Sequence, residues 1–359
     1  MPFDLRFAAL TTALGVQGSV QDLAAPGAEG GLFDPNRTRS LAGYMFNEFK
    51  FTPATRMQIS GRIEQVNVKG TTPDVFVDPF AGIARDRDFT PKSGAIGFLQ
   101  DLPGDLVASV TAQYVERAPR APELLSRGVH EATGTFDIGN PNLNIEKAKS
   151  FEIGLRRKTG PLRFEATGFY TRFDDFIFRN LTGTCDATID TCTSFGGAGT
   201  ELNEAIYTQR DAKFRGAEFQ AQLDVAPVWK GLWGVDGQYD FVRATFNDGS
   251  NVPRIPPQRV GGGLYYRDMN WFARVGVLHA FAQNDVSGNE TTTDGYNLLK
   301  AELSYTAKLR ADATGITEYK IGIVGDNLLN EDIRNAVSFK KDEVLQPSRT
   351  VRVFGSVQF

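Results

Sequence analysis

The stretch TVRVFGSVQF, residues 350–359, decides the fold of this chain because apolar residues recur at every second position. One face carries Val351, Val353, Gly355, Val357 and Phe359, and the other carries Thr350, Arg352, Ser356 and Gln358. Phe354 is the one apolar residue on the polar face. A period of two with a polar second face predicts a β-strand that is apolar on one side.

The same alternation recurs upstream, for example in residues 151–156, 162–171 and 299–307, and we count about fourteen such segments. Their connections alternate in length. The short ones are residues 52–55, 102–105, 159–161, 226–231, 267–270 and 309–315, and they are rich in turn-forming Pro, Gly, Asp and Asn. The long ones are residues 24–36, 70–88, 119–145, 179–204, 247–253, 284–295 and 330–347.

Tight turns at one end and long loops at the other are typical of an antiparallel outer-membrane β-barrel. The strands of a soluble sandwich also alternate, but its crossing connections have no reason to alternate in length. Aromatic residues gather near strand ends, as in the interfacial girdles of membrane barrels. They are Tyr44, Phe46, Phe49, Phe51, Trp229, Trp233, Tyr265, Tyr266, Trp271 and Phe272.

Composition excludes several classes of protein. The net charge of −4 and the pI of about 5.5 lack the basic footprint of a nucleic-acid binder. Two Cys and two His in 359 residues rule out a disulfide-rich scaffold and a multi-His metal centre. The longest early stretch without charge, residues 7–21, is too short for a spanning helix. Neither a nucleotide fingerprint nor a Ser-His-Asp pattern is present, so we expect no enzyme.

Several motifs resemble, in order and spacing, the barrel of TonB-dependent outer-membrane receptors. The central set is ERAP at 116–119, ELL at 123–125, GNPNL at 139–143, Glu146, and EIGL at 152–155. The later set is DAKFRGAE at 211–218, PRIPP at 253–257, ET at 290–291, DGY at 294–296 and DNLLN at 326–330. Each motif alone is weak, but the ordered set covers most of the chain.

This resemblance implies a transmembrane β-barrel of 22 strands, closed by an N-terminal plug that contacts the TonB complex. Residues 1–359 then correspond to the C-terminal part of the barrel domain, with the plug and about eight strands missing. The resemblance also implies an outer-membrane location, contact with membrane lipid, TonB coupling only through the missing plug, and a monomer. Phe359 resembles the C-terminal Phe that such barrels present to the barrel assembly machinery. A complete fourteen-stranded barrel without a plug is the competing architecture.

The long segment 119–145 contains the sharpest candidate site. His130 lies in SRGVHEATGTF, residues 126–136, which resembles the loop of the zinc-related branch of the family in which a His helps bind metal. Glu131 or Asp137 could add oxygen ligands. Arg117 and Arg120, near the start of the loop, are candidates for binding an anionic chelate. The alternative for His130 is a surface His bonded within its own loop.

Other side chains have simpler predicted roles. Cys185 and Cys192 lie in a polar loop and are expected to form a disulfide in an oxidising exterior, with half of a metal site as the alternative. His279 shares a face with apolar neighbours and is expected in the outer girdle. Charges expected to line the lumen are Arg156, Arg163, Glu165, Lys300, Glu302 and Arg352.

The favoured function is therefore uptake of a scarce metal ion or metal chelate, such as zinc or a ferric siderophore, as transported substrate, with no resident cofactor. A porin-like channel without a plug is the alternative. An outer-membrane lipase that uses His279 ranks last because no partner Ser stands out.

Overall fold

The computed structural model describes residues 2–4, 7–25, 31–74, 81–186, 191–194, 202–308 and 317–358. In this part of the chain, nineteen strands form one sheet and the helix α1, Ala121–Leu125, is the single helical element. Among the described residues, no helix is long and apolar enough to cross a membrane. The prediction of an all-β antiparallel protein is confirmed.

Fourteen of the nineteen described strands are long and form the wall of the sheet, and the other five are short. They are β2 (Ala9–Ala25), β3 (Phe33–Lys50), β4 (Thr55–Thr71), β6 (Lys92–Leu102), β7 (Leu106–Arg117), β10 (Glu146–Arg157), β11 (Leu162–Asp186), β13 (Leu202–Val228), β14 (Gly231–Phe246), β15 (Arg259–Arg267), β16 (Trp271–Ala280), β17 (Tyr296–Lys308), β18 (Glu318–Asp326) and β19 (Thr350–Gln358). Each pairs antiparallel with the next, as a meander.

The five short strands were not predicted. They are β1 (Pro2–Asp4), β5 (Ala84–Phe89), β8 (Arg127–His130), β9 (Thr135–Ile138) and β12 (Thr191–Ser194). β1 pairs with the edge of β2 that faces away from β3, and β9 pairs with β13 in parallel. β8, β9 and β12 lie within segments predicted as long loops, and so does β5 except for its last residue, Phe89.

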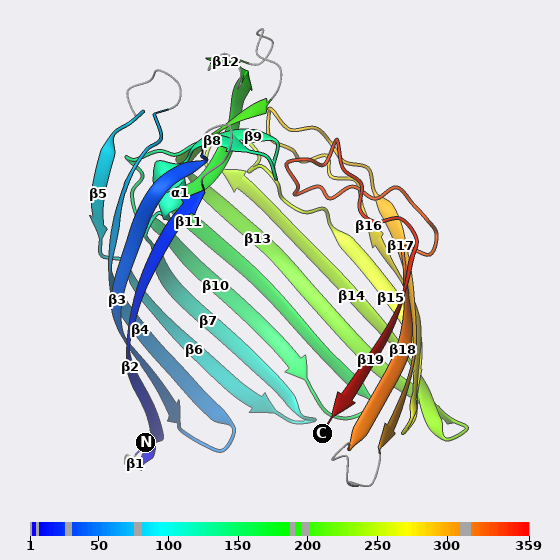
Figure 1. The fold of residues 1–359 in the computed structure, drawn as a ribbon. Helices are drawn as coiled ribbons and strands as arrows, with labels where there is room; N and C mark the ends of the chain where they lie inside the picture. Colours follow the sequence, from blue (N-terminus) through cyan, green and yellow to red (C-terminus); the bar gives the residue numbers. More distant parts are fainter. Residues whose placement is uncertain are drawn as a thin grey trace.

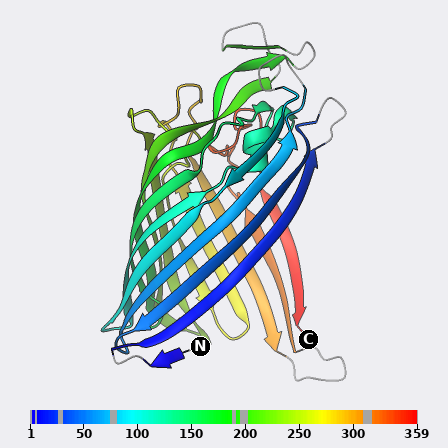
Figure 2. The same cartoon turned by 90° about the vertical axis from the view of Figure 1, so that its left-hand side faces the viewer.

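The wall curves strongly, with its strands tilted against the long axis (Figures 1 and 2). The tight turns lie at one end of the strands, together with both chain termini, and the long connections lie at the other end, as predicted (Figure 1). We call these the turn end and the loop end. Continuous ladders run from β2 to β19, but no residue-by-residue ladder joins β19 to β2 in the described part, and Figure 1 shows these two strands well apart.

The two faces of the wall differ as the alternation predicts. Aliphatic side chains on the outer face are exposed, with 77% of Val16 and 74% of Val353 accessible. The inner face carries ion pairs, such as Arg163 with Asp224 at 2.8 Å. An apolar outer face that the rest of the described chain leaves uncovered, opposite a charged inner face, is the pattern of a sheet that faces lipid on one side.

Phe354, the apolar exception on the polar face, has a packing role. It pairs with Gly322 on β18, and its ring covers that glycine so closely that a Cβ there would lie 2.5 Å from the ring. The ammonium of Lys320 lies 5.3 Å from the ring centroid. An aromatic ring laid across a cross-strand glycine fills the space that the missing side chain leaves.

Residues 179–204 were predicted as a loop, and that prediction is wrong for most of them. β11 continues to Asp186 and β13 begins at Leu202, so their ladder extends beyond the wall, with Cys185 opposite Leu202. This part of the hairpin projects past the other strands in Figure 2. Outside the lipid a strand need not alternate apolar and polar residues, so the pattern that revealed the wall is absent here.

Buried apolar side chains gather at the loop end rather than along the wall. One cluster joins α1 to β4, β5 and β11 and contains Val66, Val68, Phe89, Ala121, Leu124, Leu125, Leu143 and Ile177. The other contains Phe178, Ala212, Ala244, Phe246 and Val252. These two clusters fix the loop-end segments to the wall and so position the candidate site.

Candidate functional site

Arg117 anchors the first part of the long segment between β7 and β10. Its guanidinium donates to both carboxylate oxygens of Glu146 at 3.1 Å and to Glu123 at 2.7 Å. Glu123 also accepts the backbone N–H of Arg120 at 2.7 Å. Arg117 is thus engaged in holding α1 against the wall, whereas the side chain of Arg120 is exposed. The predicted role of both residues in binding substrate stays a prediction.

The structure brings together His130 and Asp137, which lie on the paired strands β8 and β9. The Nδ1 atom of His130 is 2.9 Å from the Asp137 carboxylate, which is 3% exposed. That carboxylate also accepts from Thr135 Oγ1 at 2.6 Å and from Arg179 at 2.9 Å. Glu131 is exposed in the turn that joins the two strands.

These contacts fit Asp137 less well as a metal ligand than as a hydrogen-bond partner of His130. A metal bound by its oxygens would have to displace a guanidinium from a buried carboxylate. As a hydrogen-bond partner of Nδ1, however, Asp137 orients the imidazole and leaves Nε2 as the ring atom for a ligand. His130 with Asp137 behind it fits a single metal ligand with a positioning carboxylate, which alone does not make a metal site.

A wider arrangement joins this hairpin to three loops, and the sequence analysis missed it. The ring of Phe339 lies between two guanidiniums, with Arg179 at 3.8 Å and Arg254 at 3.2 Å from its centroid. Arg254 donates to the carbonyl of Arg179 at 3.1 Å. We call the set the loop junction; its members are Asp137, Arg179, Arg254, Glu290, Phe339 and Lys341.

The loop junction is largely desolvated. Lys341 and Glu290 form an ion pair at 3.5 Å with side chains 5% and 7% exposed, and Glu290 also accepts the backbone N–H of Arg254 at 3.1 Å. Burial lowers the pKa of Arg254 to about 10, so the side chain stays charged at neutral pH. Its members come from β9, β11 and the connections after β14, β16 and β18, so no local pattern could have revealed them.

A cavity of about 620 Å³ lies where the connection 327–349 meets the inner face of the wall. We call it the wall pocket. Its charged lining residues include Arg259, Lys300, Asp326, Arg334 and Arg352, and its apolar lining residues include Pro256, Tyr296, Ile333 and Val337. Lys300 and Arg352 were predicted on this inner face. The other lining residues were not, because the pocket exists only where the β18–β19 connection folds against the wall.

Cations outnumber anions in the described lining of the wall pocket. Asp326 pairs with Lys300 at 2.9 Å and with Arg352 at 3.3 Å, so one carboxylate serves two cations. Arg259 pairs with Asp240 at 2.9 Å. Arg334 donates to the carbonyl of Lys341. The pocket therefore combines surplus positive charge with an apolar side, which suits an amphipathic anion.

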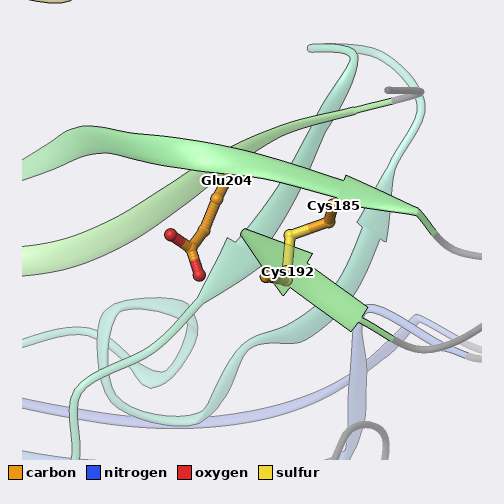
Figure 3. Close-up of side chains that lie close together, drawn as sticks. All are labelled: Cys185, Cys192 and Glu204. Carbon is orange, nitrogen blue, oxygen red and sulfur yellow. A yellow bond between two sulfur atoms is a disulfide. The ribbon is translucent and has the colours of Figure 1, made fainter. Parts of the chain in front are cut away.

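A disulfide joins Cys185 and Cys192 (Figure 3). Cys185 is buried in β11 and not in a loop, and Cys192 lies opposite it in β12. The carboxylate of Glu204 lies beside the pair and accepts from Thr182 Oγ1 at 2.5 Å. With both sulfur atoms bonded to each other, this trio does not offer thiolates to a metal.

His279 lies at the loop end of β16, on the face of the exposed Val275 and Val277, as expected for a girdle residue. Its Nδ1 is 2.9 Å from the amide oxygen of Asn297, and its ring packs edge-on against Phe281. A ring nitrogen bonded to an amide gives no support to the lipase hypothesis. Phe359, the predicted assembly signal, lies outside the described residues.

Comparison with known proteins defines the class. The family model described as TonB dependent receptor-like, beta-barrel matches residues 3–328, so the chain belongs to this family. Barrels of this family are proteins of the Gram-negative outer membrane, which places the chain there. The zinc-related branch is not distinguished by this match.

Individual proteins agree with this class. The copper transporter OprC aligns with 99% of this chain and 55% of its own, with a TM-score of 0.74 and 18% identity. The ferric citrate transporter FecA, unliganded, aligns with 99% and 52%, with a TM-score of 0.67 and 16% identity. A probable hemoglobin and hemoglobin-haptoglobin-binding protein of Haemophilus influenzae is 25% identical over 233 residues, 63% of this chain and 22% of that protein. The chain thus spans about half the length of the structures it resembles.

Proposed function

We propose that this chain forms wall and extracellular loops of an outer-membrane receptor that takes up a scarce metal ion or metal chelate, energised through TonB. The observation that carries the proposal is the family match over residues 3–328. Similar proteins are named for copper, ferric citrate and hemoglobin, so members of this class bind or transport metals in several chemical forms. Zinc and ferric siderophores remain the two candidate substrates.

Coupling to TonB belongs to the whole receptor in this proposal. Residues 1–359 contribute wall, inner face and loops of the barrel, and contact with TonB is made through the plug of the whole receptor. The length of the chain relative to its structural relatives supports this division. We further propose that the receptor acts as a monomer.

The wall pocket favours a chelate over a bare ion as the substrate that meets this face. Surplus cations repel a free metal ion but attract carboxylate or catecholate oxygens that surround a bound metal. The apolar side, with Tyr296 and Ile333, contacts the carbon skeleton of such a ligand. A bare zinc ion would instead depend on His130.

Uptake of labelled substrate by cells tests the proposal. We expect cells that carry the receptor to accumulate a ⁵⁵Fe-labelled anionic chelate, and we expect depletion of TonB to abolish this uptake. The double variant Lys300→Gln/Arg352→Gln should lower uptake at least threefold by removing two pocket cations. Arg163→Gln, which removes an inner-face cation near the turn end, is the matched control and should leave uptake unchanged.

The opposite results are equally informative. Uptake that persists without TonB, together with steady conductance in planar bilayers, would contradict the receptor and favour the porin-like channel. For zinc, His130→Ala should weaken binding by the complete receptor about tenfold if the imidazole is a ligand. Unchanged zinc affinity would remove His130 from the proposal.

A further inference from the structure

A notch on the outer face of the wall at the turn end combines aromatic sides with an apolar floor. Its volume is about 390 Å³, and Trp229, Lys230, Tyr266, Asp268, Trp271, Ala273 and Leu303 line it. The floor is Ala273 on β16 and its ladder partner Leu303 on β17. Because Ala273 is small and its neighbours are large, the outer face is hollowed here.

The side of the notch formed by Trp229 is unusual in conformation and exposure. Trp229 has a φ of 50°, in the left-handed region that bulky residues avoid, and 92% of its surface is exposed. Its ring packs edge-on against Tyr266, at 5.9 Å between centroids. Trp229 covers no protein core, so packing does not explain its strained backbone. This strain at an exposed aromatic residue points to a ligand outside the protein that the ring contacts.

The second side is held rigidly. The Asp268 carboxylate accepts the backbone N–H groups of Asn270 and Trp271 and the hydroxyl of Tyr266, each at 2.7 Å. Trp271 packs edge-on against Tyr305, at 4.9 Å. A Cβ on Gly231 would lie 2.7 Å from the Cβ of Asp268, so the turn that carries Trp229 and Lys230 rests directly on the turn that carries Asp268.

The mouth of the notch therefore presents both signs of charge above an apolar floor. The exposed ammonium of Lys230 offers a partner for a phosphate, and Asp268 with the aromatic faces offers one for an ammonium. In a barrel of this class the tight turns face the periplasm, so the notch opens at the headgroup level of the inner leaflet. This complementarity selects a lipid that carries both charges.

We propose that this notch is a binding site for one zwitterionic glycerophospholipid of the inner leaflet, with its phosphate at Lys230, its ammonium near Asp268 and Trp229, and an acyl chain over Ala273 and Leu303. The site depends on an outer-membrane location but not on the transported substrate. Its failure would therefore leave the proposed uptake function intact.

Native mass spectrometry of the receptor purified from outer membranes, titrated with phosphatidylethanolamine, tests the site. We expect one lipid to bind more tightly than the rest. Lys230→Ala should weaken it at least fivefold by removing the phosphate partner, and Ala273→Phe should weaken it at least fivefold by filling the floor. Lys158→Ala, in the turn that joins β10 and β11, and Ala301→Phe, farther up the outer face, are matched controls for charge and bulk that should retain the lipid.

Three outcomes would overturn the proposal. In the first, Lys230→Ala and Ala273→Phe both bind the lipid like their controls while resistance to heat and to SDS shows that they are folded. In the second, phosphatidylglycerol, which lacks the ammonium, binds as tightly as phosphatidylethanolamine. In the third, glycerophosphoethanolamine without acyl chains displaces the lipid at equal concentration, which would make the notch a site for a soluble phosphate compound.

Discussion

Arg179 shows how one side chain can hold the loop end together. It is 18% exposed, pairs with the buried Asp137 and stacks on Phe339. Removing one partner of a desolvated ion pair leaves an uncompensated charge, which costs about 3–5 kcal/mol when burial is complete. Because Arg179 is partly exposed, we expect Arg179→Met to destabilise the loop junction by about 2 kcal/mol, seen as faster hydrogen exchange in β8 and β9.

The matched control for this prediction is Arg210→Met. Arg210 lies on the same strand pair but forms an exposed ion pair with Asp248, and exposed pairs contribute about 0–1 kcal/mol. Equal exchange in the two variants would show that the loop junction does not depend on the buried pair.

Asp268 gives a prediction about pH. Hydrogen bonds from the backbone of Trp271, from Tyr266 and from the backbone of Asn270 lower the pKa of this carboxyl below its ordinary value. A carboxyl whose pKa is lower in the folded state stabilises the fold above its unfolded pKa, near 3.9, and the stabilisation is lost as the pH falls through the folded pKa. Asp268→Asn should therefore unfold at a lower temperature than the parent at pH 7, and the difference should shrink as the pH falls through the lowered pKa of Asp268. A difference that stays constant with pH would contradict the argument.

Single residues were predicted from the sequence only where a local pattern carried information. His130 was singled out because residues 126–136 resemble a metal-binding loop of the family, and Asp137 because it follows in the same segment; the structure joins the two by a hydrogen bond. Phe339, Arg254 and Glu290 were not found, because each comes from a different connection and alternation says nothing about which loops meet. The role of Asp137 also differed, since its guanidinium partner Arg179 lies 42 positions away.

At the scale of elements, the strands that contact lipid were predictable and the others were not. Lipid requires an apolar residue at every second position, which the sequence shows from β2 to β19. Backbone ladders also form at β5, β8, β9, β12 and the outer part of the β11–β13 hairpin, which lie at the loop end beyond the alternating part of the wall. Their sequences lack a regular alternation of polar and apolar residues, which is why these segments were predicted as loops.

The extended β11–β13 hairpin carries the disulfide, which leads to a prediction about local stability. The two cysteines are 7 positions apart, and closing so short a loop stabilises it by roughly 2.5 kcal/mol in the chain-entropy model. We expect Cys185→Ser/Cys192→Ser, or reduction, to speed hydrogen exchange in residues 182–186 and 202–206 while leaving β14 to β19 unchanged. Faster exchange throughout the wall would show that the disulfide supports the whole sheet.

At the scale of the whole molecule, the two edge strands of the wall, β2 and β19, differ in how far their outer edges are paired. The first edge is partly covered, because β1 pairs with Thr11, Leu10 and Ala9 of β2. β19 pairs with β18 on one side, and no ladder with β2 completes its other side in the described part. Unpaired backbone groups in hydrocarbon cost several kcal/mol each, so such edges require further strands or closure. Local alternation specifies faces but not which strands meet around a barrel, which is why the sequence left a closed fourteen-stranded barrel as an alternative.

Cross-linking in the outer membrane distinguishes these architectures. In a Cys185→Ser/Cys192→Ser background, Val353→Cys is combined in turn with Leu14→Cys, Val16→Cys or Val20→Cys, all exposed positions on β19 and β2. Because β2 and β19 lie apart, we expect none of these pairs to form a disulfide under mild oxidation (Figure 1). Val353→Cys with Ile323→Cys is the positive control, since these two residues are ladder partners and lie within the Cα separation that a disulfide spans. Efficient bridging between β19 and any position of β2 would show instead that these strands close directly on each other as a complete fourteen-stranded barrel.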